Sequence, residues 1–166
     1  MKGKQQSRLH ELLKDARVVM FSTIDNGVIR SRPMAIQRVD EDNTLWLLSE
    51  DKTAKIDEIQ NYDAVNISFM DMKAQVYVSL SGTAEESRNL DKIRELWSLP
   101  LKAWFPDGPE QGVRVIQITP EIAEYWSTPS SAVMHAIGLT KALLNGEQYN
   151  DEAAEHVKVS GAATRI

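Results

Sequence analysis

Hydrophobic and polar residues alternate along most of this chain with the two-residue period of β-strands. The alternation is clearest in residues 64–70, where Val65, Ile67 and Phe69 are expected to face a core. Residues 17–24 are apolar on both alternations, which is typical of a strand buried on both sides. With their bounding turn residues, these patterns predict strands at 17–24, 28–39, 44–49, 64–70, 75–85, 113–119 and 122–126.

Turn and breaker residues indicate how these strands are arranged. Asn26-Gly27 between two strands predicts a tight hairpin, because a type I′ turn needs positive φ at both central positions. Pro33 cannot donate a hydrogen bond to a β-ladder, so its strand is expected to be an edge or to bulge at that point. Gly82 inside a long strand predicts a bulge or the close approach of another backbone.

Helical periodicity is confined to short segments. In residues 52–61, for example, Ile56 and Ile59 share one face. The connection 98–112 contains three prolines and two glycines and is predicted to be a structured loop. Short helices are expected at 5–15, 52–61, 90–97 and 131–144.

Strands joined mainly by tight turns, with short helices inserted, predict a mainly β protein of the α+β class built as a closed antiparallel barrel. Residues 1–146 are expected to form one domain. Residues 147–166 are small and polar and are predicted to be a mobile C-terminal tail.

Composition narrows the functional classes. The 166 residues include no cysteine, which excludes disulfides and thiolate chemistry and fits a reducing cytoplasm, the expected location. A net charge of −5 argues against a nucleic-acid partner. No run of 18 apolar residues is present, so no membrane span is expected, and the basic N-terminus leads into no apolar segment typical of a secretory signal.

The chain lacks the common catalytic and nucleotide motifs. It contains no GxGxxG or P-loop sequence, and no GxSxG nucleophile elbow. His10, His135 and His156 are far apart and without ligand spacing, so surface or packing roles are more plausible for them than metal binding. No metal site is predicted.

One local arrangement is suited to binding an anion. Ser49 ends a predicted strand, and Thr53 and Lys55 follow at the start of a predicted helix. Backbone N–H groups and the dipole at a helix start favour an anion, and lysine adds positive charge. The same pattern also fits an ordinary solvated helix start, and the pattern alone does not decide between the two.

Aromatic residues cluster late in the chain. The segment from Trp104 to Pro109 holds Trp and Phe in a loop fixed by proline and glycine. Such a loop fits a cover for a flat ring or a subunit contact, and it equally fits a loop folded over its own core. Gln75, at the start of a predicted strand, is either a polar group in a pocket or an ordinary strand end.

Five segments together carry a family resemblance: RSRPMAIQ (30–37), LWLLSEDKTAKIDEIQNYDAVNISF (45–69), QVYVSLSGTAE (75–85), LWSLPLKAWFPDGPE (96–110) and AEYW (123–126). On these segments the chain resembles the pyridoxamine 5′-phosphate oxidase-like split-barrel flavoproteins, and more narrowly their general stress protein 26 branch. The resemblance implies a six-stranded antiparallel split β-barrel with short flanking helices. It also implies a homodimer with one FMN at each of two sites between the subunits.

The resemblance assigns cofactor contacts to individual positions. Thr53 and Lys55 match the phosphate-binding segment of the family, whereas Ala54 stands where the parent oxidases carry a second cation. Trp104 belongs to a loop that is expected near the flavin or the dimer interface. The full set of implied FMN contacts is Arg32, Pro33, Met34, Leu48, Ser49, Thr53, Lys55, Gln75, Trp104 and Trp126.

The departures from the family bear on function. The oxidases carry an Arg-x-His segment after the tryptophan that corresponds to Trp126, and this chain does not. Oxidation of pyridoxamine phosphate is therefore not expected. The resemblance implies an FMN-dependent oxidoreductase of unknown substrate, with NAD(P)H or another small reductant as donor. The alternatives are a non-enzymatic FMN-binding stress or redox-sensing protein, and a dimeric structural module with an empty site.

Overall fold

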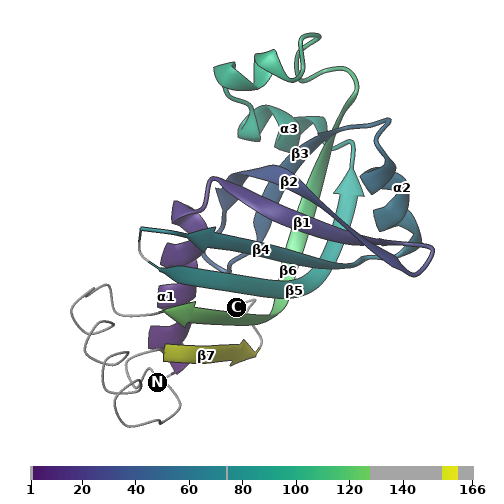
Figure 1. Ribbon diagram of the computed structural model, residues 1–166. Helices are drawn as coiled ribbons and strands as arrows, with labels where there is room; N and C mark the ends of the chain where they lie inside the picture. The colour runs from purple at the N-terminus through teal and green to yellow at the C-terminus, as the bar shows by residue number, and fades with distance from the viewer. Residues whose placement is uncertain (1, 74, 128–154, 161–166) are drawn as a thin grey trace, which may run out of the picture.

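The computed structural model describes residues 2–73, 75–127 and 155–160 (Figure 1). The elements are α1 (Lys2–Asp15), β1 (Val18–Asp25), β2 (Val28–Val39), β3 (Leu45–Glu50), α2 (Ala54–Asn61), β4 (Ala64–Asp71), β5 (Val76–Ser87), α3 (Leu90–Leu96), the 3₁₀ helix η1 (Leu99–Ala103), β6 (Val113–Ser127) and β7 (Glu155–Ser160).

Six strands close into an antiparallel barrel. The sheet order is β3-β2-β1-β4-β5-β6-β7, and an additional pairing of β3 with β6 closes the first six strands into a ring. The predicted six-stranded antiparallel barrel with short flanking helices is therefore confirmed. Asn26 and Gly27 have φ values of 49° and 82° in the β1–β2 turn, as the hairpin prediction requires.

The strands predicted at 113–119 and 122–126 are in fact one 15-residue strand, β6. Its first part pairs with β3 and its last part pairs with β7. Pro120 lies between these two paired parts of β6, where no backbone N–H is needed for a hydrogen bond to β3 or β7. The register with β5 shifts between Ser81 and Gly82, which confirms the bulge predicted at Gly82. One strand replaces the two predicted because proline is tolerated where a strand changes one of its neighbours.

A seventh strand lies within the segment predicted to be a polar mobile tail. β7 pairs with the end of β6, and its Val157 and Val159 are buried against the core. Alternate valines therefore anchor this part of the chain, a signal too short to stand out among small polar residues. The helix predicted at 131–144 lies outside the described residues.

β1 differs from its prediction as a strand buried on both faces. Val19 and Phe21 are buried, whereas Val18 and Met20 are 60% and 41% exposed. Within the part of the chain that the structure describes, no element covers this outer face of β1. Pro33 pairs opposite Met20 in a part of β2 that β3 does not reach, which confirms the predicted edge position.

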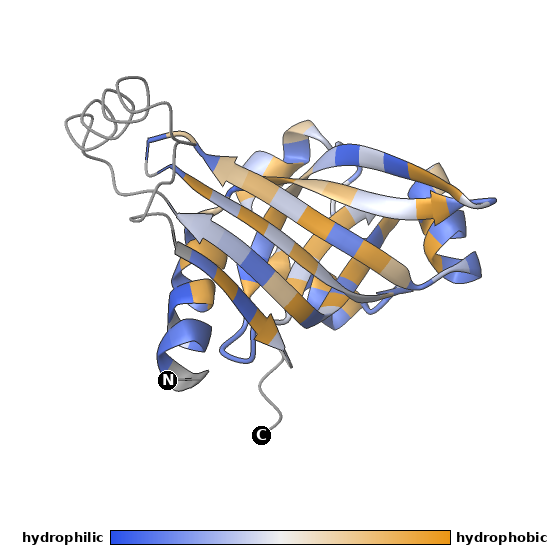
Figure 2. Ribbon diagram, turned by 60° about the horizontal axis from the view of Figure 1, so that its bottom comes forward, coloured by the Kyte–Doolittle hydropathy of each residue, from blue (hydrophilic) through white to orange (hydrophobic). Residues whose placement is uncertain are grey.

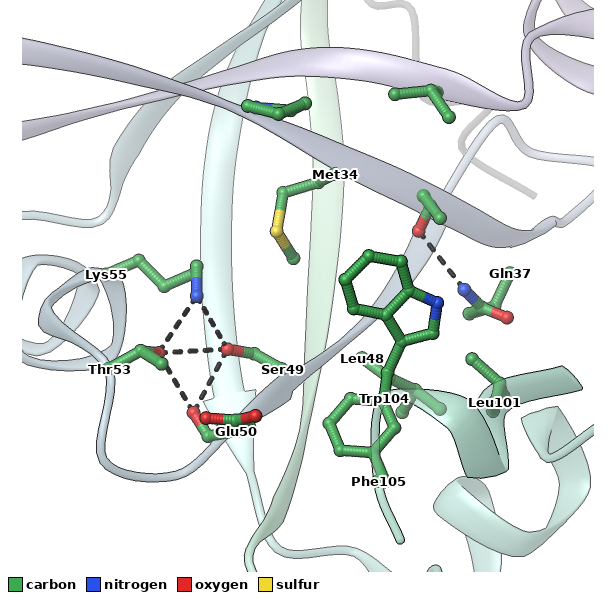
Figure 3. Close-up of a pocket in the computed structure, with 13 residues that line it drawn as sticks. Met34, Gln37, Leu48, Ser49, Glu50, Thr53, Lys55, Leu101, Trp104 and Phe105 are labelled. Carbon is green, nitrogen blue, oxygen red and sulfur yellow. Dashed lines mark hydrogen bonds between the residues drawn. The ribbon is translucent and has the colours of Figure 1, made fainter.

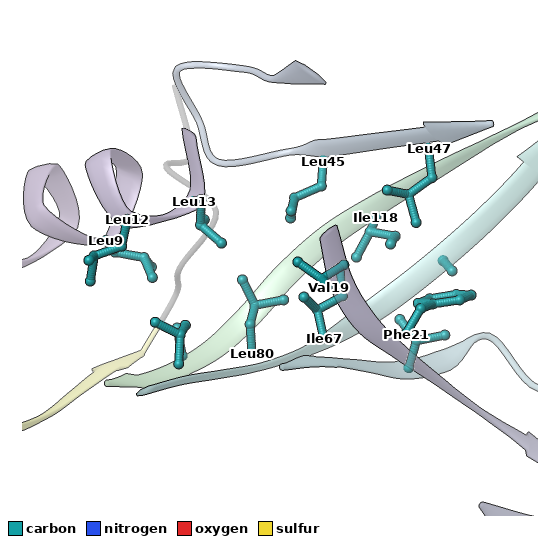
Figure 4. Packing of buried hydrophobic residues seen from close by; sticks show 14 of the residues in the cluster. Leu9, Leu12, Leu13, Val19, Phe21, Leu45, Leu47, Ile67, Leu80 and Ile118 are labelled. Atoms are coloured by element: carbon teal, nitrogen blue, oxygen red, sulfur yellow. The ribbon is translucent and has the colours of Figure 1, made fainter. Parts of the chain in front are cut away.

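Two apolar clusters hold the elements together. The larger fills the barrel and includes Leu9 and Leu13 of α1 (Figure 4). Helix α1 lies at one end of the barrel and α3 toward the other (Figure 1). The smaller lies beneath α3 and η1 and includes Leu48, Ile93 and Leu101. Apolar and polar positions alternate along the barrel strands (Figure 2). Among the described residues, no helix has the length and apolarity needed to cross a bilayer.

Candidate functional site

A pocket of about 480 Å³ lies where β2, the end of β3, the start of α2 and the segment around η1 meet. This volume falls within the range of small-molecule and cofactor sites. Most of its lining side chains are apolar; Ser49, Glu50, Thr53 and Lys55 gather at one end, and Gln37 lies at the other, beside Trp104 (Figure 3). The lining residues are Val18, Pro33, Met34, Ala35, Gln37, Leu48, Ser49, Glu50, Thr53, Lys55, Leu101, Trp104 and Phe105.

The polar end is a triangle of one ammonium and two hydroxyl groups. Lys55 Nζ donates to Ser49 Oγ and to Thr53 Oγ1, each at 3.0 Å, and the two hydroxyl oxygens are also 3.0 Å apart. Both hydroxyls donate to the backbone oxygen of Glu50, at 3.0 Å from Ser49 and 2.9 Å from Thr53 (Figure 3). The β3–α2 corner therefore gathers one ammonium and two hydroxyl groups at one place, and each hydroxyl gives its single proton to the Glu50 carbonyl.

The carboxylates of Glu50 and Glu58 favour the charged form of Lys55, but neither forms an ion pair with it. Burial lowers the pKa of Lys55 below its ordinary value, and the positive charge of Arg32 lowers it further. None of the ion pairs found among the described residues includes Lys55. Thr53 caps α2 without a side-chain bond to the helix, so the positive end of the helix dipole also faces this corner. The corner is suited to an anion.

The other end of the pocket is apolar and carries aromatic side chains. Met34 of β2 lies between the polar corner and Trp104, and Leu101 and Phe105 lie beside Trp104 (Figure 3). Trp104 is 75% exposed, although its side chain is large and apolar. Phe105 packs toward Trp97, with ring centroids 6.0 Å apart. The loop thus packs on the chain's own core through Phe105 and presents Trp104 at the pocket.

The structure brings together seven of the ten residues that the resemblance implies. Arg32, Gln75 and Trp126 do not line the pocket of a single chain. Arg32 pairs with Glu58, and Gln75 lies in the β4–β5 connection with a φ of 51°. Trp126 lies near the end of β6 and stacks on His156 at a centroid distance of 5.0 Å. The seven residues at the pocket are Pro33, Met34, Leu48, Ser49, Thr53, Lys55 and Trp104.

Some lining residues were not predicted from the sequence. Gln37 extends the pocket wall along β2, where it donates to the backbone oxygen of Ala35 at 3.3 Å. Leu101 reaches the site from η1, more than fifty positions along the chain from Gln37. The alternation of β2 is the one signal that could have indicated Gln37 and Ala35, because they share a face with Pro33.

An exposed row of large side chains crosses the sheet outside this pocket. In register across four strands, Met70 lies opposite Tyr77, Tyr77 opposite Trp126, and Trp126 opposite His156. Met70, Tyr77 and Trp126 are all exposed although they are large and hydrophobic. A contiguous exposed row of this kind marks an interaction surface more often than single exposed apolar residues do.

The six-stranded barrel, with its pocket at the β3–α2 corner, is a split barrel. The sequence profile of the family described as pyridoxamine 5′-phosphate oxidase like matches residues 4–150, and the chain belongs to this family. A curated relative, protein bli-3 of Neurospora crassa, is 26% identical over 151 residues, which is 84% of this chain and 72% of that protein.

Solved structures of the same fold extend the comparison. A protein of Clostridium acetobutylicum related to general stress protein 26 of B. subtilis (pyridoxinephosphate oxidase family) superposes with a TM-score of 0.67 and 20% identity, covering 75% of this chain and 89% of that one. The general stress FMN/FAD binding protein of Xanthomonas citri gives a TM-score of 0.66 and 22% identity, covering 79% and 93%. The family and split-barrel fold implied by the sequence are confirmed.

Proposed function

We propose that this protein binds FMN, with the phosphate in the corner formed by Ser49, Thr53 and Lys55. The single observation that carries the proposal is the half-buried ammonium of Lys55, which donates to two hydroxyls and forms no ion pair with the nearby carboxylates of Glu50 and Glu58. A phosphate accepts hydrogen bonds from such donors and neutralises the charge.

The rest of the pocket suits the flavin ring system. Pro33 and Met34 of β2 and the indole of Trp104 offer apolar surfaces on which a planar ring can pack. When bound, FMN would supply redox chemistry at its own ring, and the chain would hold and orient it and exclude water. The description of the Xanthomonas citri protein as FMN/FAD binding supports this choice of ligand.

We further propose that a second copy of the chain completes each site. Val18 both lines the pocket and lies on the exposed outer face of β1, so the pocket opens onto an apolar surface. The row from Met70 to Trp126 supplies a second apolar surface. Association of two copies would bury both surfaces and bring Gln75 and Trp126 of one chain toward the flavin of the other.

Within this framework an FMN-dependent oxidoreductase is the primary assignment, and the substrate stays undefined. Flavin chemistry needs no dedicated acid or base from the protein, so an apolar pocket is sufficient. The alternative is a non-enzymatic flavin store or redox sensor. Rapid mixing of the FMN-loaded protein with NADH and NADPH separates these two functions, because bleaching of the flavin absorbance supports a reductase and inertness to every donor supports a binding protein.

The cysteine-free composition favours the cytoplasm as the site of action.

FMN is expected to bind at least about a hundredfold more tightly than riboflavin, which lacks the phosphate. Two or three charge-assisted contacts contribute roughly 3–9 kcal/mol before desolvation, and a hundredfold needs about 2.7 kcal/mol. Titrations of the purified protein with both flavins, followed by fluorescence, measure this ratio. Equal affinities would contradict the phosphate assignment.

Replacing Tyr77 by glutamate is expected to yield a monomer and to weaken FMN binding at least tenfold, because a charge then lies within the apolar row. Tyr62→Glu is the matched control, since Tyr62 is also an exposed tyrosine but lies at the end of α2, away from that row. Light scattering after size-exclusion chromatography reports the mass of each variant. A Tyr77→Glu variant with the mass of the wild type would refute the proposed interface.

A further inference from the structure

The segment that presents Trp104 to the pocket is packed as a unit of its own. This α3–η1 unit, residues 90–110, projects beyond the barrel (Figure 1). It is tied internally, because Arg94 of α3 forms two hydrogen bonds of 2.9 Å with Glu110, and the rings of Trp97 and Phe105 pack together. Its buried apolar side chains belong to the smaller cluster and not to the barrel core. The place of Trp104 therefore depends on how the unit is held against the strands.

A ring of polar and aromatic side chains joins α3 to β2 and β3. Trp46 of β3 lies opposite Arg38 of β2, and its Nε1 donates to Asp40 Oδ2 at 2.7 Å. Arg38 forms ion pairs with Asp40 and, on α3, with Glu95. Lys92, also on α3, has its Nζ 2.8 Å from Glu95 Oε2. Two cations and two carboxylates balance, so this network is neutral.

The Trp46 indole is the surface on which α3 rests. Lys92 Nζ lies 4.4 Å from the centroid of the indole, and Arg38 Cζ lies 5.8 Å from it. Both distances fall within the range of cation–π attraction, which is stronger when the cation is partly withdrawn from water, and the Lys92 side chain is only 21% exposed. Exposed ion pairs contribute little by themselves, so the half-buried stack of Lys92 on Trp46 is the stronger restraint on α3.

We propose that Lys92 is a positioning residue, which holds α3 on the Trp46 indole and thereby sets the place of Trp104 at the ring end of the pocket. This inference rests on the proposed function. Lys92 does not line the pocket itself, whereas Leu101 of η1 does. The backbone N–H groups of Trp104 and Phe105 both donate to the Leu101 backbone oxygen, at 3.0 and 2.9 Å, so a shift of the unit moves Trp104 with it.

The expected effect is confined to the end of the pocket that takes the flavin ring. The phosphate corner around Lys55 lies at the opposite end from Trp104 (Figure 3). Loss of the Lys92 stack should therefore weaken FMN and riboflavin by the same factor and leave the ratio of their affinities unchanged. An indole in contact with a flavin quenches its fluorescence, so the brightness of the bound flavin reports whether Trp104 lies against the ring.

The test compares Lys92→Met with Lys92→Arg in titrations with both flavins. Methionine keeps much of the length and removes the charge, whereas arginine retains a cation over the indole. We expect Lys92→Met to weaken both flavins about three- to tenfold and to brighten the bound flavin, and Lys92→Arg to stay within about twofold of wild type. Lys102→Met is the matched control, because Lys102 is an exposed lysine of η1 that does not line the pocket, and no change is expected there.

A double-mutant cycle separates positioning of Trp104 from general damage. In the Trp104→Leu background, Lys92→Met should have no further effect on flavin affinity or fluorescence. Equal effects in both backgrounds, or wild-type affinity in either single variant, overturn the inference. Should Lys92→Met lose the circular dichroism spectrum of the wild type, Trp46→Phe carries the same test, because phenylalanine offers a weaker face to the cation and loses the bond to Asp40.

The outcomes also distinguish this inference from the proposed function. If the wild type binds neither flavin, the proposed function fails and this inference falls with it. If the wild type binds FMN and the cycle shows no coupling between Lys92 and Trp104, only the inference fails.

Discussion

Replacing Lys55 by methionine is expected to weaken FMN binding about ten- to hundredfold and to leave riboflavin binding nearly unchanged. One charge-assisted hydrogen bond contributes on the order of 1.5–3 kcal/mol, which corresponds to that range. Methionine retains much of the length of the side chain and removes its charge, so the change isolates the ammonium group. Fluorescence titrations with the two flavins measure the effect.

Lys52→Met is the matched control for this variant. Lys52 lies three positions earlier and is exposed, and it does not line the pocket. Its replacement removes the same charge from the same region, and we expect FMN affinity to change by no more than about twofold, because exposed charges are screened. Equal losses in the two variants would show that general electrostatics, and not the corner, recognise the phosphate.

The pH dependence of FMN binding provides a second readout for Lys55. Because burial and Arg32 lower the pKa of the free Lys55, the ammonium loses its proton at a lower pH than an ordinary lysine does. A bound phosphate favours the charged form, so affinity is full below the pKa of the free protein and falls as the pH rises through it. This alkaline fall should be absent from Lys55→Met.

Replacing Gly82 by alanine is expected to lower the free energy of unfolding by about 3 kcal/mol or more. A Cβ atom at this position would lie 2.1 Å from the backbone oxygen of Thr119 and 2.9 Å from Cα of Pro120. Both are backbone atoms of β6, so the clash can be relieved only by separating two paired strands. For a protein of this size the loss corresponds to roughly 6–12 °C in melting temperature.

Gly27→Asn is the control for the glycine substitution. A Cβ on Gly27 would have no atom within 4 Å, and asparagine adopts the positive φ of that turn more readily than other residues do. A change of about 1 kcal/mol or less is expected. Thermal unfolding followed by circular dichroism compares the variants, and a Gly82→Ala protein as stable as the wild type would refute the proposed close approach.

The barrel could be predicted from the sequence because each strand carries its own two-residue period and tight turns separate the strands. Two features depended on distant contacts and were therefore missed. The outer face of β1 is apolar like its inner face, and the pattern cannot distinguish burial in the barrel from exposure of Val18 and Met20. β7 is only six residues long, and its pairing partner lies across a long segment of chain.

The candidate site likewise contains residues that could be predicted from local sequence and contacts that could not. Ser49, Thr53 and Lys55 could be identified because they lie within seven consecutive positions at a strand–helix junction. The partner of Arg32 could not, because Glu58 lies on a helix whose face toward the hairpin depends on tertiary packing. The family resemblance therefore indicated an arginine at position 32, but it could not indicate that this side chain pairs with Glu58 in the single chain.

The opening of the pocket beside Val18 has a thermodynamic consequence for the proposed dimer. A flavin bound there is shielded only as far as a second chain covers it, so ligand affinity and self-association are linked by mass action. Each flavin that binds favours pairing of the chains by the same factor by which pairing favours the flavin. Dilution of the protein should therefore release the cofactor, and saturation with the cofactor should hold the chains together at concentrations at which they would otherwise separate.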